Sequence, residues 1–452
     1  TARACFRASR RARRLYKLVY WLAMEINRYQ TRKPKRLAVV TMGVKLGDET
    51  RGYTRFRFLS ELLAREGFEV DLITSSFQHW DKAHRDTSKA CYRNLPYNVV
   101  FIDEPGYTKN LDLTRIRSHR VAAKNLREHF ERTAGTYDLV YAEIPPNDVA
   151  RVCAEEADKQ GIPFVADIND LWPEAMRMVV DVPVVSDVAF YPFSRDAKRV
   201  YQLLSAAVGT SDEYAARPAK DRAKPYPKAT VYVGNDLAAF DEGARINAPA
   251  VRKPEGELWV VYAGTLGASY DVATLVEAAA LLERGRLVRA ASKDDELPPA
   301  LPPVRVKVLG DGPDREKLEA LAVQLNAPVD FLGYTAYELM AAYLCASDIT
   351  VNSLVKSAAQ SIVTKIGDYL ASGNPMINTG SSPEFRAKVT ADGFGVNVEA
   401  EDAQALADAI AKLAGHASLR KIMGSKARAV AEKEFDQPRA YREIVDLLRT
   451  LL

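Results

Sequence analysis

The pattern of apolar and polar positions divides most of the chain into short apolar runs separated by amphipathic stretches. The apolar runs of the first half predict strands, and helical periodicity lies between most of them, as at 56–65, 113–132 and 148–159. Strands that are apolar throughout and alternate with helices are typical of a parallel sheet covered on both faces. The predicted strands are 37–43, 68–75, 98–103, 137–142, 162–168, 206–211 and 229–235.

The alternation stops at a polar stretch with proline and glycine that ends near Glu257, and then it restarts. We therefore predict an α/β protein of two doubly wound domains joined near residue 240. Residues 286–303 contain two Pro-Pro pairs and are expected to form a surface loop. Ligands of such sheets bind outside the carboxyl ends of the strands, so we expect the functional site in the cleft between the domains. The predicted strands of the second half are 258–264, 304–310, 329–333, 348–352, 374–378 and 395–399.

Composition places the chain among globular proteins. Of its 452 residues 47% are hydrophobic, which is enough to fill real cores and excludes a disordered or fibrous class. Its four cysteines lie far apart without a C-x-x-C pair, so neither a zinc site nor a disulfide framework is indicated. A reducing, cytoplasmic compartment is the expected location.

The formal net charge of +4 is distributed unevenly along the chain. Residues 1–36 contain twelve Lys and Arg and one acidic residue, a net charge of +11, so the remaining residues carry −7. In this leader an apolar stripe lies opposite the basic residues, and the apolar run 15–26 is shorter than the roughly 20 residues that a spanning helix needs. We interpret residues 1–36 as a basic amphipathic extension that binds an anionic membrane surface, where each basic residue contributes about 1 kcal/mol.

Two other interpretations of the leader stay open. It can be a solvated tail or a helix packed on the body, and a basic arm can also bind nucleic acid. We favour the membrane surface because the amphipathic pattern places an apolar stripe where lipid would be. We expect no nucleic-acid partner.

Two glycine turns in the second half are suited to binding a phosphate group. Gly264 and Gly267 lie between a predicted strand and a helix that starts near Asp271, and Gly310 and Gly312 occupy the same position after the next strand. Glycine permits close backbone approach, and the N–H groups at a helix start attract an anion. A tight strand-to-helix turn without any ligand would use the same residues.

The segment SIVTKIGDYLASGNPMINTG, at 361–380, contains a second kind of candidate. A helix from about Ser361 would place Lys365 and Asp368 three residues apart, on adjacent faces. A lysine can neutralise a diphosphate, and an aspartate can accept hydrogen bonds from a ribose diol. An exposed helical ion pair of little consequence explains the spacing equally well.

Two segments resemble motifs of one enzyme family. TKIGDYLASGNPMI (364–377) resembles the signature of the retaining glycosyltransferases of family 4, and FVADINDLWPE (164–174) is similar to a segment of bacterial members that build exopolysaccharide and O-antigen units. The resemblance covers roughly 37–450. It implies the GT-B fold, in which two Rossmann-like doubly wound domains face each other across a cleft. We expect the first domain at 37–240, the second at 241–435, and a C-terminal helix at 436–452 that packs back on the first.

The resemblance also implies a mechanism and a set of site residues. A nucleotide-sugar donor would bind the second domain, an acceptor would bind the first, and the sugar would be transferred with retention and without an obligatory metal. The chain contains no Asp-x-Asp, the usual carboxylate clamp for a metal–diphosphate, so we expect no metal site and no other cofactor. We expect Lys365 and Asp170 to be catalytic, Gly52, Arg55, Asn169 and Glu174 to bind the acceptor, and Gly264, Thr265, Gly267, Gly310, Gly312, Thr364, Lys365 and Asp368 to bind the donor.

The chain departs from the family pattern in three respects. Gln360 and Asp368 occupy the places of two glutamates, and Thr265 and Tyr270 occupy those of basic residues after the first glycine turn. Asn169 stands where many members have a cleft histidine before the aspartate. These departures leave Lys365, with Arg51 or Arg55, as the main cationic candidates. His79 and His84 have no metal partner at usable spacing, and we assign them to the surface or to packing.

A capping role for Asp170, with Trp172 buried, is the alternative to sugar binding at that segment. For the whole chain we expect a glycosyltransferase of the hexosyltransferase type, peripheral to the inner face of the plasma membrane. It would act on a glycan acceptor, lipid-linked, in cell-surface polysaccharide biosynthesis. Two alternatives are a catalytically weak GT-B scaffold that binds a partner, and a nucleotide-sugar 2-epimerase. The epimerase is disfavoured because no histidine-rich cleft is evident in the sequence.

Overall fold

A computed structural model describes residues 33–47, 49, 54–109, 113–177, 185–291, 301–358 and 362–452. The predictions for the leader up to residue 32, and for Arg51, Gly52 and Gln360, lie outside these ranges. In the described residues no helix is long and apolar enough to cross a membrane.

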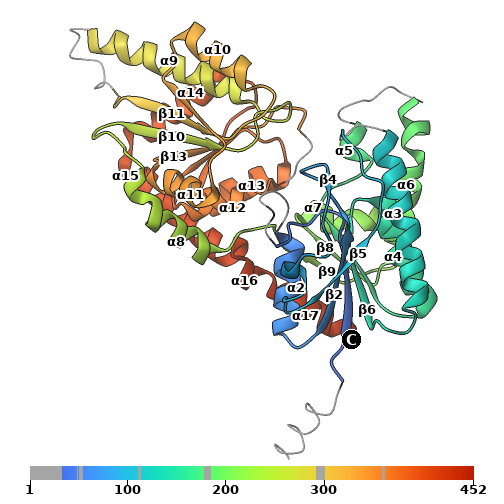
Figure 1. Ribbon diagram of the computed structural model, residues 1–452. Helices are drawn as coiled ribbons and strands as arrows, with labels where there is room; N and C mark the ends of the chain where they lie inside the picture. The colour runs from blue at the N-terminus through green and yellow to red at the C-terminus, as the bar shows by residue number, and fades with distance from the viewer. Residues whose placement is uncertain are drawn as a thin grey trace, which may run out of the picture.

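The first domain is built on a parallel sheet that, in the described residues, has seven strands. Helices α3 (Leu113–Arg132), α4 (Asn147–Gln160) and α6 (Val185–Leu203) cover one face, with their apolar side chains in one core cluster. Helices α2 (Arg55–Arg65) and α17 (Arg442–Leu451) cover the other face (Figure 1). In spatial order the strands are β5 (Asn98–Ile102), β2 (Glu69–Ser75), β1 (Arg36–Val40), β6 (Leu139–Ile144), β7 (Phe164–Ile168), β8 (Ala206–Gly209) and β9 (Lys228–Thr230).

The second domain repeats this plan with six described parallel strands. Its order is β12 (Val329–Gly333), β11 (Val304–Leu309), β10 (Leu258–Ala263), β13 (Ile349–Asn352), β14 (Met376–Asn378) and β15 (Gly395–Asn397). One face packs against α9 (Val272–Ala291), α10 (Arg315–Leu325) and α14 (Ala403–Gly415). The other face packs against α8 (Leu237–Asn247), α11 (Tyr337–Ala346), α12 (Ile366–Ala371), α13 (Pro383–Asp392) and α15 (Ala417–Val430).

The predicted alternation of strands and helices is therefore confirmed, with one difference in the second domain. The expected surface loop at 286–303 is wrong in its first part, because α9 continues to Ala291. The residues RLVRAA that extend the helix are good helix formers, and the proline pairs begin only later.

Several short elements complete the two domains. A two-stranded hairpin of β3 (Phe77–Gln78) and β4 (Ala83–His84) stands at the carboxyl edge of the first sheet. The remaining short elements are α5 (Glu174–Arg177), α7 (Asp212–Ala216), α16 (Gln437–Ala440), the 3-10 turns η1 (Ala90–Tyr92), η2 (Arg217–Lys220) and η3 (Ala248–Ala250), and the π-helical turn η4 (Ala431–Phe435).

The chain crosses between the domains twice, and the two crossings are paired. The Asn235 N–H donates to the Phe435 carbonyl, and the Gln437 N–H donates to the Asn235 carbonyl, both over 2.9 Å. Gly234 has a φ of +61°, and a Cβ there would lie 2.1 Å from the Phe435 oxygen. After the second crossing, α17 inserts Ile444, Val445 and Leu448 into the core of the first domain. The C-terminus thus ends on the domain where the fold begins, as Figure 1 shows.

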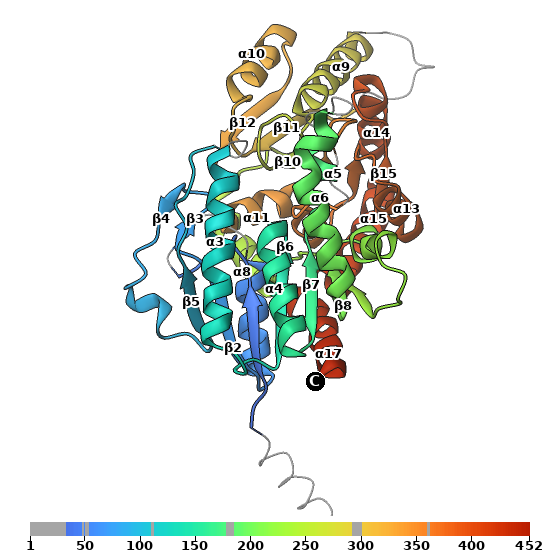
Figure 2. The same ribbon diagram turned by 90° about the vertical axis from the view of Figure 1, so that its right-hand side faces the viewer.

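The strand orders place two topological switch points opposite each other. In the first sheet the order reverses between β1 and β6, and in the second sheet it reverses between β10 and β13. At such a point neighbouring loops turn to opposite faces and leave a crevice at the carboxyl ends of the strands. Figure 2 shows the first domain in front of the second, with the N-terminal ends of α3 and α6 toward the second domain.

Candidate active site

A pocket of about 600 Å³ lies between the two switch points, and both domains line it. The first domain contributes residues that follow its strands, among them Met42, Glu143 and Asn169. The second domain contributes three segments: 268–270 after β10, 355–358 after β13, and 362–364 before α12. The expectation of a site in the cleft between the domains agrees with this position.

The first-domain end of the pocket is aromatic and contains one arginine. Trp80, at the tip of the β3–β4 hairpin, and Trp172, after β7, both line the cavity. Arg115, in the first turn of α3, lies with its guanidinium carbon 4.9 Å from the centre of the Trp172 ring and 5.4 Å from that of Tyr107. Aromatic faces beside a cation are suited to binding the apolar face and the hydroxyl groups of a sugar ring.

Two histidines at this end are held neutral. Burial lowers the pKa of His79 to about 4, assisted by the positive charges of Lys82 and Arg115. Burial lowers the pKa of His119 to about 3, again assisted by Arg115. The Nδ1 atom of His79 lies 2.5 Å from the Tyr107 hydroxyl. Neutral imidazoles can donate and accept hydrogen bonds at physiological pH without adding charge to the pocket.

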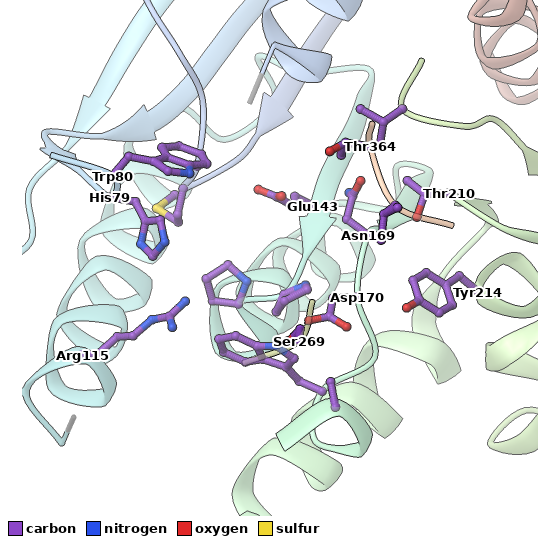
Figure 3. A pocket seen from close by; sticks show the side chains of 18 of the residues that line it. His79, Trp80, Arg115, Glu143, Asn169, Asp170, Thr210, Tyr214, Ser269 and Thr364 are labelled. Carbon is purple, nitrogen blue, oxygen red and sulfur yellow. Dashed lines mark hydrogen bonds between the residues drawn. The ribbon is translucent and has the colours of Figure 1, made fainter. Parts of the chain in front are cut away.

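Glu143 lies near the middle of the cavity, between this aromatic end and the loops of the second domain (Figure 3). It is near the carboxyl end of β6, and the Thr41 hydroxyl at the end of β1 donates a hydrogen bond to its carboxyl group. Burial raises the pKa of Glu143 to about 8, although the Thr41 hydrogen bond acts in the opposite direction. The side chain is therefore largely a neutral acid at pH 7.

Arg55 does not reach the pocket, so the prediction that it binds the acceptor is wrong. Its side chain is fully buried and forms a two-point ion pair with Asp167, over 2.8 and 3.0 Å. It also donates to the Val231 and Tyr232 carbonyls and to the Tyr441 hydroxyl. Burial opposes its charge, but Asp167 outweighs this effect and raises the Arg55 pKa well above its ordinary value. Arg55 joins α2, β7, the first crossing and the C-terminal segment.

Asn169 and Asp170 do line the pocket, as expected for the segment after β7. The amide nitrogen of Asn169 donates to the Asp167 carbonyl, and its Oδ1 atom is buried without a hydrogen-bond partner in the described residues. Asp170 accepts from the Leu171 N–H and from the Trp172 indole N–H. Burial raises the pKa of Asp170. Asp170 thus fixes the orientation of the Trp172 ring. It bonds to its own loop, as the capping alternative predicts, and it also lines the pocket, as the predicted sugar site requires.

The role of Glu174 in acceptor binding stays a prediction. Glu174 begins the short helix α5 and forms an ion pair with Arg217, over 2.7 Å, instead of lining the cavity. Arg217 is held in turn by Asp221, four residues further along the chain. The Glu174 carboxylate is therefore paired with Arg217, which lies far away in the sequence, so no local sequence pattern reveals the contact.

Lys365 is a buried cation without an ordinary partner. Among the described residues its Nζ atom has no hydrogen-bond partner and lies against two aromatic rings, 4.2 Å from the centre of Tyr262 and 4.1 Å from that of Tyr270. Burial lowers its pKa to about 7. Tyr270 lines the pocket, so its ring contacts both the cavity and the amine. A buried amine without a carboxylate is unfavourable unless an anion joins it.

The helix that carries this segment begins later than predicted. Lys365 is the residue before α12, which starts at Ile366, so the expected start near Ser361 is wrong. Asp368 accepts from the Asn235 amide over 2.7 Å and from the Tyr337 hydroxyl over 2.8 Å. Burial raises the pKa of Asp368 to about 6. Asp368, which is predicted to accept hydrogen bonds from a ribose, therefore already accepts one from Asn235 in the first interdomain crossing. A bound ribose would share the Asp368 carboxylate with Asn235 and Tyr337.

The glycine turns have two different roles. Ala268, Ser269 and Tyr270 line the pocket just after Gly264, Thr265 and Gly267, and Thr364 lines it from the segment before α12. Gly310 and Gly312 instead allow the second turn to touch the first. A Cβ at Gly310 would lie 1.8 Å from the Gly264 oxygen, and one at Gly312 would lie 2.1 Å from the Leu266 oxygen. The second turn thus supports the first and does not line the pocket.

The sequence does not predict several polar and aromatic residues of the pocket, among them His79, Trp80, Arg115, His119 and Glu143. His79 packs against Trp80 and Tyr107 and also lines the cavity, which the prediction of a surface or packing role does not include, and His84 is exposed as predicted. One signal was present for Glu143, because it directly follows the predicted strand 137–142, at the edge where ligands bind. Hairpin and helix residues carry no such signal. Within the described residues no group of three or more His, Cys, Asp or Glu is arranged to hold a metal ion.

Comparisons with known proteins bear on this geometry. Residues 257–416 match the profile of the family described as glycosyl transferases group 1. No curated protein sequence matches the chain. Many solved structures are similar in fold, and three of them illustrate the similarity. Sucrose-phosphate synthase from Thermosynechococcus elongatus is 17% identical, with 92% of this chain and 99% of that chain covered and a TM-score of 0.63.

The other two structures are similar to the same degree. Anabaena Alr3699/HepE in complex with UDP-glucose is 16% identical over 92% of this chain and 100% of that chain, with a TM-score of 0.61. WaaG, a glycosyltransferase involved in lipopolysaccharide biosynthesis, is 14% identical. The similarity covers 91% of this chain and 99% of that chain, with a TM-score of 0.59. The predicted GT-B fold is therefore confirmed, and the match to glycosyl transferases group 1 covers most of the second domain.

Proposed function

We propose that this protein is a retaining, metal-independent glycosyltransferase that transfers a hexose from a nucleotide-diphosphate donor to a lipid-linked glycan acceptor. The reaction would serve cell-surface polysaccharide biosynthesis, at the inner face of the plasma membrane. The resemblance of 164–174 and 364–377 to family 4, and in particular to members that build exopolysaccharide and O-antigen units, supports this proposal. Solved structures of the same fold that bind UDP or UDP-glucose support the donor class.

The observation that carries the proposal is the Lys365 amine, which is buried against Tyr262 and Tyr270 without a hydrogen-bond partner in the described residues. A donor diphosphate would supply the anion that this amine lacks. As the bond between the sugar and the diphosphate breaks, negative charge develops on the leaving oxygen, and a positioned ammonium stabilises it. The nearby turn 264–270 would hold the rest of the diphosphate through backbone N–H groups.

The acceptor would bind at the aromatic end of the pocket. Trp80 and Trp172 offer ring faces, and Arg115 and Asn169 offer donors and acceptors for hydroxyl groups. The incoming hydroxyl would approach the anomeric carbon from the side on which the diphosphate leaves, which retains the configuration. The basic leader, residues 1–36, would hold the protein at the surface where a lipid-linked acceptor lies.

The test begins with a panel of nucleotide sugars, UDP-glucose, UDP-galactose, UDP-N-acetylglucosamine and GDP-mannose. We expect at least one to raise the melting temperature and to release its nucleoside diphosphate slowly. Lys365→Ala should abolish both effects, and Lys317→Ala, an exposed lysine on α10, should change neither. If the Lys365 variant turned the donor over at the normal rate, the diphosphate assignment would be wrong.

One observation favours a second candidate function. The cleft contains two neutral histidines and a neutral carboxyl group, which corrects the expectation that it is poor in histidine. Acid–base groups of this kind also suit a nucleotide-sugar 2-epimerase. Incubation of the donor alone distinguishes the two, because an epimerase would convert its sugar to the 2-epimer, whereas a glycosyltransferase would leave the remaining donor unchanged.

A further inference from the structure

A row of polar side chains crosses the first sheet at its switch point. Glu143 on β6 is the register partner of Asp167 on β7, and Thr41, which follows β1, donates its hydroxyl proton to Glu143. Register partners on parallel strands direct their side chains to the same face of the sheet. Thr41, Glu143 and Asp167 therefore form one row, which begins at the crevice where doubly wound sheets bind their ligands.

The two carboxyl groups of this row have opposite surroundings. Asp167 forms the two-point ion pair with Arg55 and also accepts from the Tyr141 hydroxyl. Arg55 is turned toward Asp167 and the crossing, so its charge is already used. Glu143 forms no ion pair among the described residues, and its hydrogen bonds come from uncharged groups, the Thr41 hydroxyl and the Gly43 N–H. Two neighbouring carboxyl groups with such different surroundings are typical of an acid–base pair in which one group stays charged and the other exchanges its proton.

Glu143 is also the carboxyl group best placed between the two substrate sites. In Figure 3 it stands between the aromatic end, with His79, Trp80 and Arg115, and the donor end, where Thr364 enters from the second domain. The other two carboxyl groups of the lining are already bound. Asp170 is held by Trp172 and its own loop, and Glu104 accepts from the hydroxyls of Ser75 and Ser118.

We propose that Glu143 is a catalytic residue of the transfer reaction, the base that accepts the proton of the attacking acceptor hydroxyl. This inference rests on the proposed glycosyltransferase function. In the step, the acceptor oxygen forms its bond to the anomeric carbon while its O–H bond breaks, and the proton passes to the Glu143 carboxylate. The bond from the anomeric carbon to the diphosphate breaks, and its electron pair leaves with the nucleoside diphosphate. Glu143 then loses the proton to solvent.

The charges around Glu143 set the pH at which it can act. Desolvation disfavours its carboxylate, Asp167 adds a like charge, and Arg55 and the Thr41 hydroxyl act in the opposite direction, with the pKa at about 8 as the result. Arg115, Asp170 and Glu104 are the other side chains of the lining that can carry a charge, and His79 and His119 are neutral. Since the base is the carboxylate, the rate should rise about tenfold per pH unit below pH 8 and level off above it.

The experiment uses the full chain and the nucleotide sugar that the panel identifies, at saturating concentration, with water as the attacking group. Release of nucleoside diphosphate is measured from pH 6 to pH 9.5. We expect Glu143→Gln to lower the rate about 100-fold or more and to remove its rise toward pH 8, with donor binding unchanged within about twofold. Glu156→Gln, the same exchange at a buried carboxyl group of α4 that does not line the pocket, should keep the pH profile.

A second variant separates catalysis from a structural role. Thr41→Val keeps Glu143 but removes the hydroxyl that stabilises its carboxylate, so the inflection of the pH profile should move to higher pH while the plateau rate remains within a few fold. If Glu143→Gln retained the rate and the inflection, or if Glu156→Gln lost the inflection as well, Glu143 would not be the base. If the wild-type protein neither bound nor turned over any nucleotide sugar, the proposed function itself would fail.

Discussion

The two domains each bury a cation beside a strand end, and they treat it in opposite ways. In the first domain Arg55 has an ion pair with Asp167 and donates to two carbonyls and a tyrosine hydroxyl. In the second domain the Lys365 amine has aromatic rings for neighbours and no hydrogen-bond partner among the described residues. A cation whose partners are all in the protein holds the fold together. A cation without them is available to a ligand.

Removal of the paired cation should have the largest effect on stability. Arg55→Met leaves the Asp167 carboxylate buried without its partner, which costs about 3–5 kcal/mol of the free energy of unfolding. Urea denaturation measures this loss. The double variant Arg55→Met, Asp167→Leu removes both charges and should recover part of the stability. If Arg55→Met alone were as stable as wild type, the ion pair would not be the connection between α2, β7 and the crossings.

Removal of the unpaired cation should have the opposite pattern. Lys365→Met replaces a buried amine by an apolar side chain of similar length, so the free energy of unfolding should stay the same or rise. Donor affinity should fall by about 1.5–3 kcal/mol, the contribution of a hydrogen bond to a charged group. Calorimetric titration with the identified nucleotide sugar measures the loss. A variant that was unstable but still bound the donor normally would reverse the roles that we assign to the two cations.

The same contrast predicts a pH dependence of donor binding. Burial lowers the pKa of Lys365 to about 7, so in the free protein the amine loses its proton as the pH rises through 7. A diphosphate binds the charged form, so the dissociation constant should be constant below pH 6 and rise up to about tenfold per pH unit above pH 7. Lys365→Met should abolish this rise. Titrations in buffers of different ionisation enthalpy should show proton uptake on binding for wild type alone.

The smallest effect is expected at a third cation, one that is paired near the surface. Arg217 forms its ion pair with Glu174, whose side chain is 44% exposed. Glu174→Gln should therefore change the free energy of unfolding by less than about 1 kcal/mol and leave the rate of nucleoside diphosphate release unchanged. A large loss of transfer to an acceptor, with donor hydrolysis intact, would instead support the predicted role of Glu174 in acceptor binding.

The fold could be predicted from the sequence because parallel strands buried on both faces leave continuous apolar runs. Each predicted strand has a counterpart within a few residues, and the switch points follow from the strand order. The partners of polar side chains could not be predicted in this way. Arg55 and Asp167 are 112 positions apart, and Arg55 and Tyr441 are 386 apart.

The site was predictable where a residue directly follows a strand. Asn169, Asp170 and the turn after β10 lie at strand ends, and the cavity contains them or their neighbours. Arg115 and His119 belong to the first turns of a long helix, and Trp80 to a hairpin of two-residue strands, so only the packing of the domain brings them to the pocket. Gly310 and Gly312 show the converse. Their sequence pattern is typical of a phosphate-binding turn, but in the structure they pack against the turn that follows β10.

The most direct test of the account is the release of nucleoside diphosphate from the panel of nucleotide sugars by the wild-type protein and by Lys365→Met, measured side by side with the melting temperature of each. We predict that at least one donor raises the melting temperature of the wild type and has its nucleoside diphosphate released, and that Lys365→Met remains folded but, at the same donor concentration, shows a much smaller rise and much slower release. Equal release by the two proteins, or no response of the wild type to any donor, would contradict the assignment of a nucleotide-sugar site to the unpaired lysine.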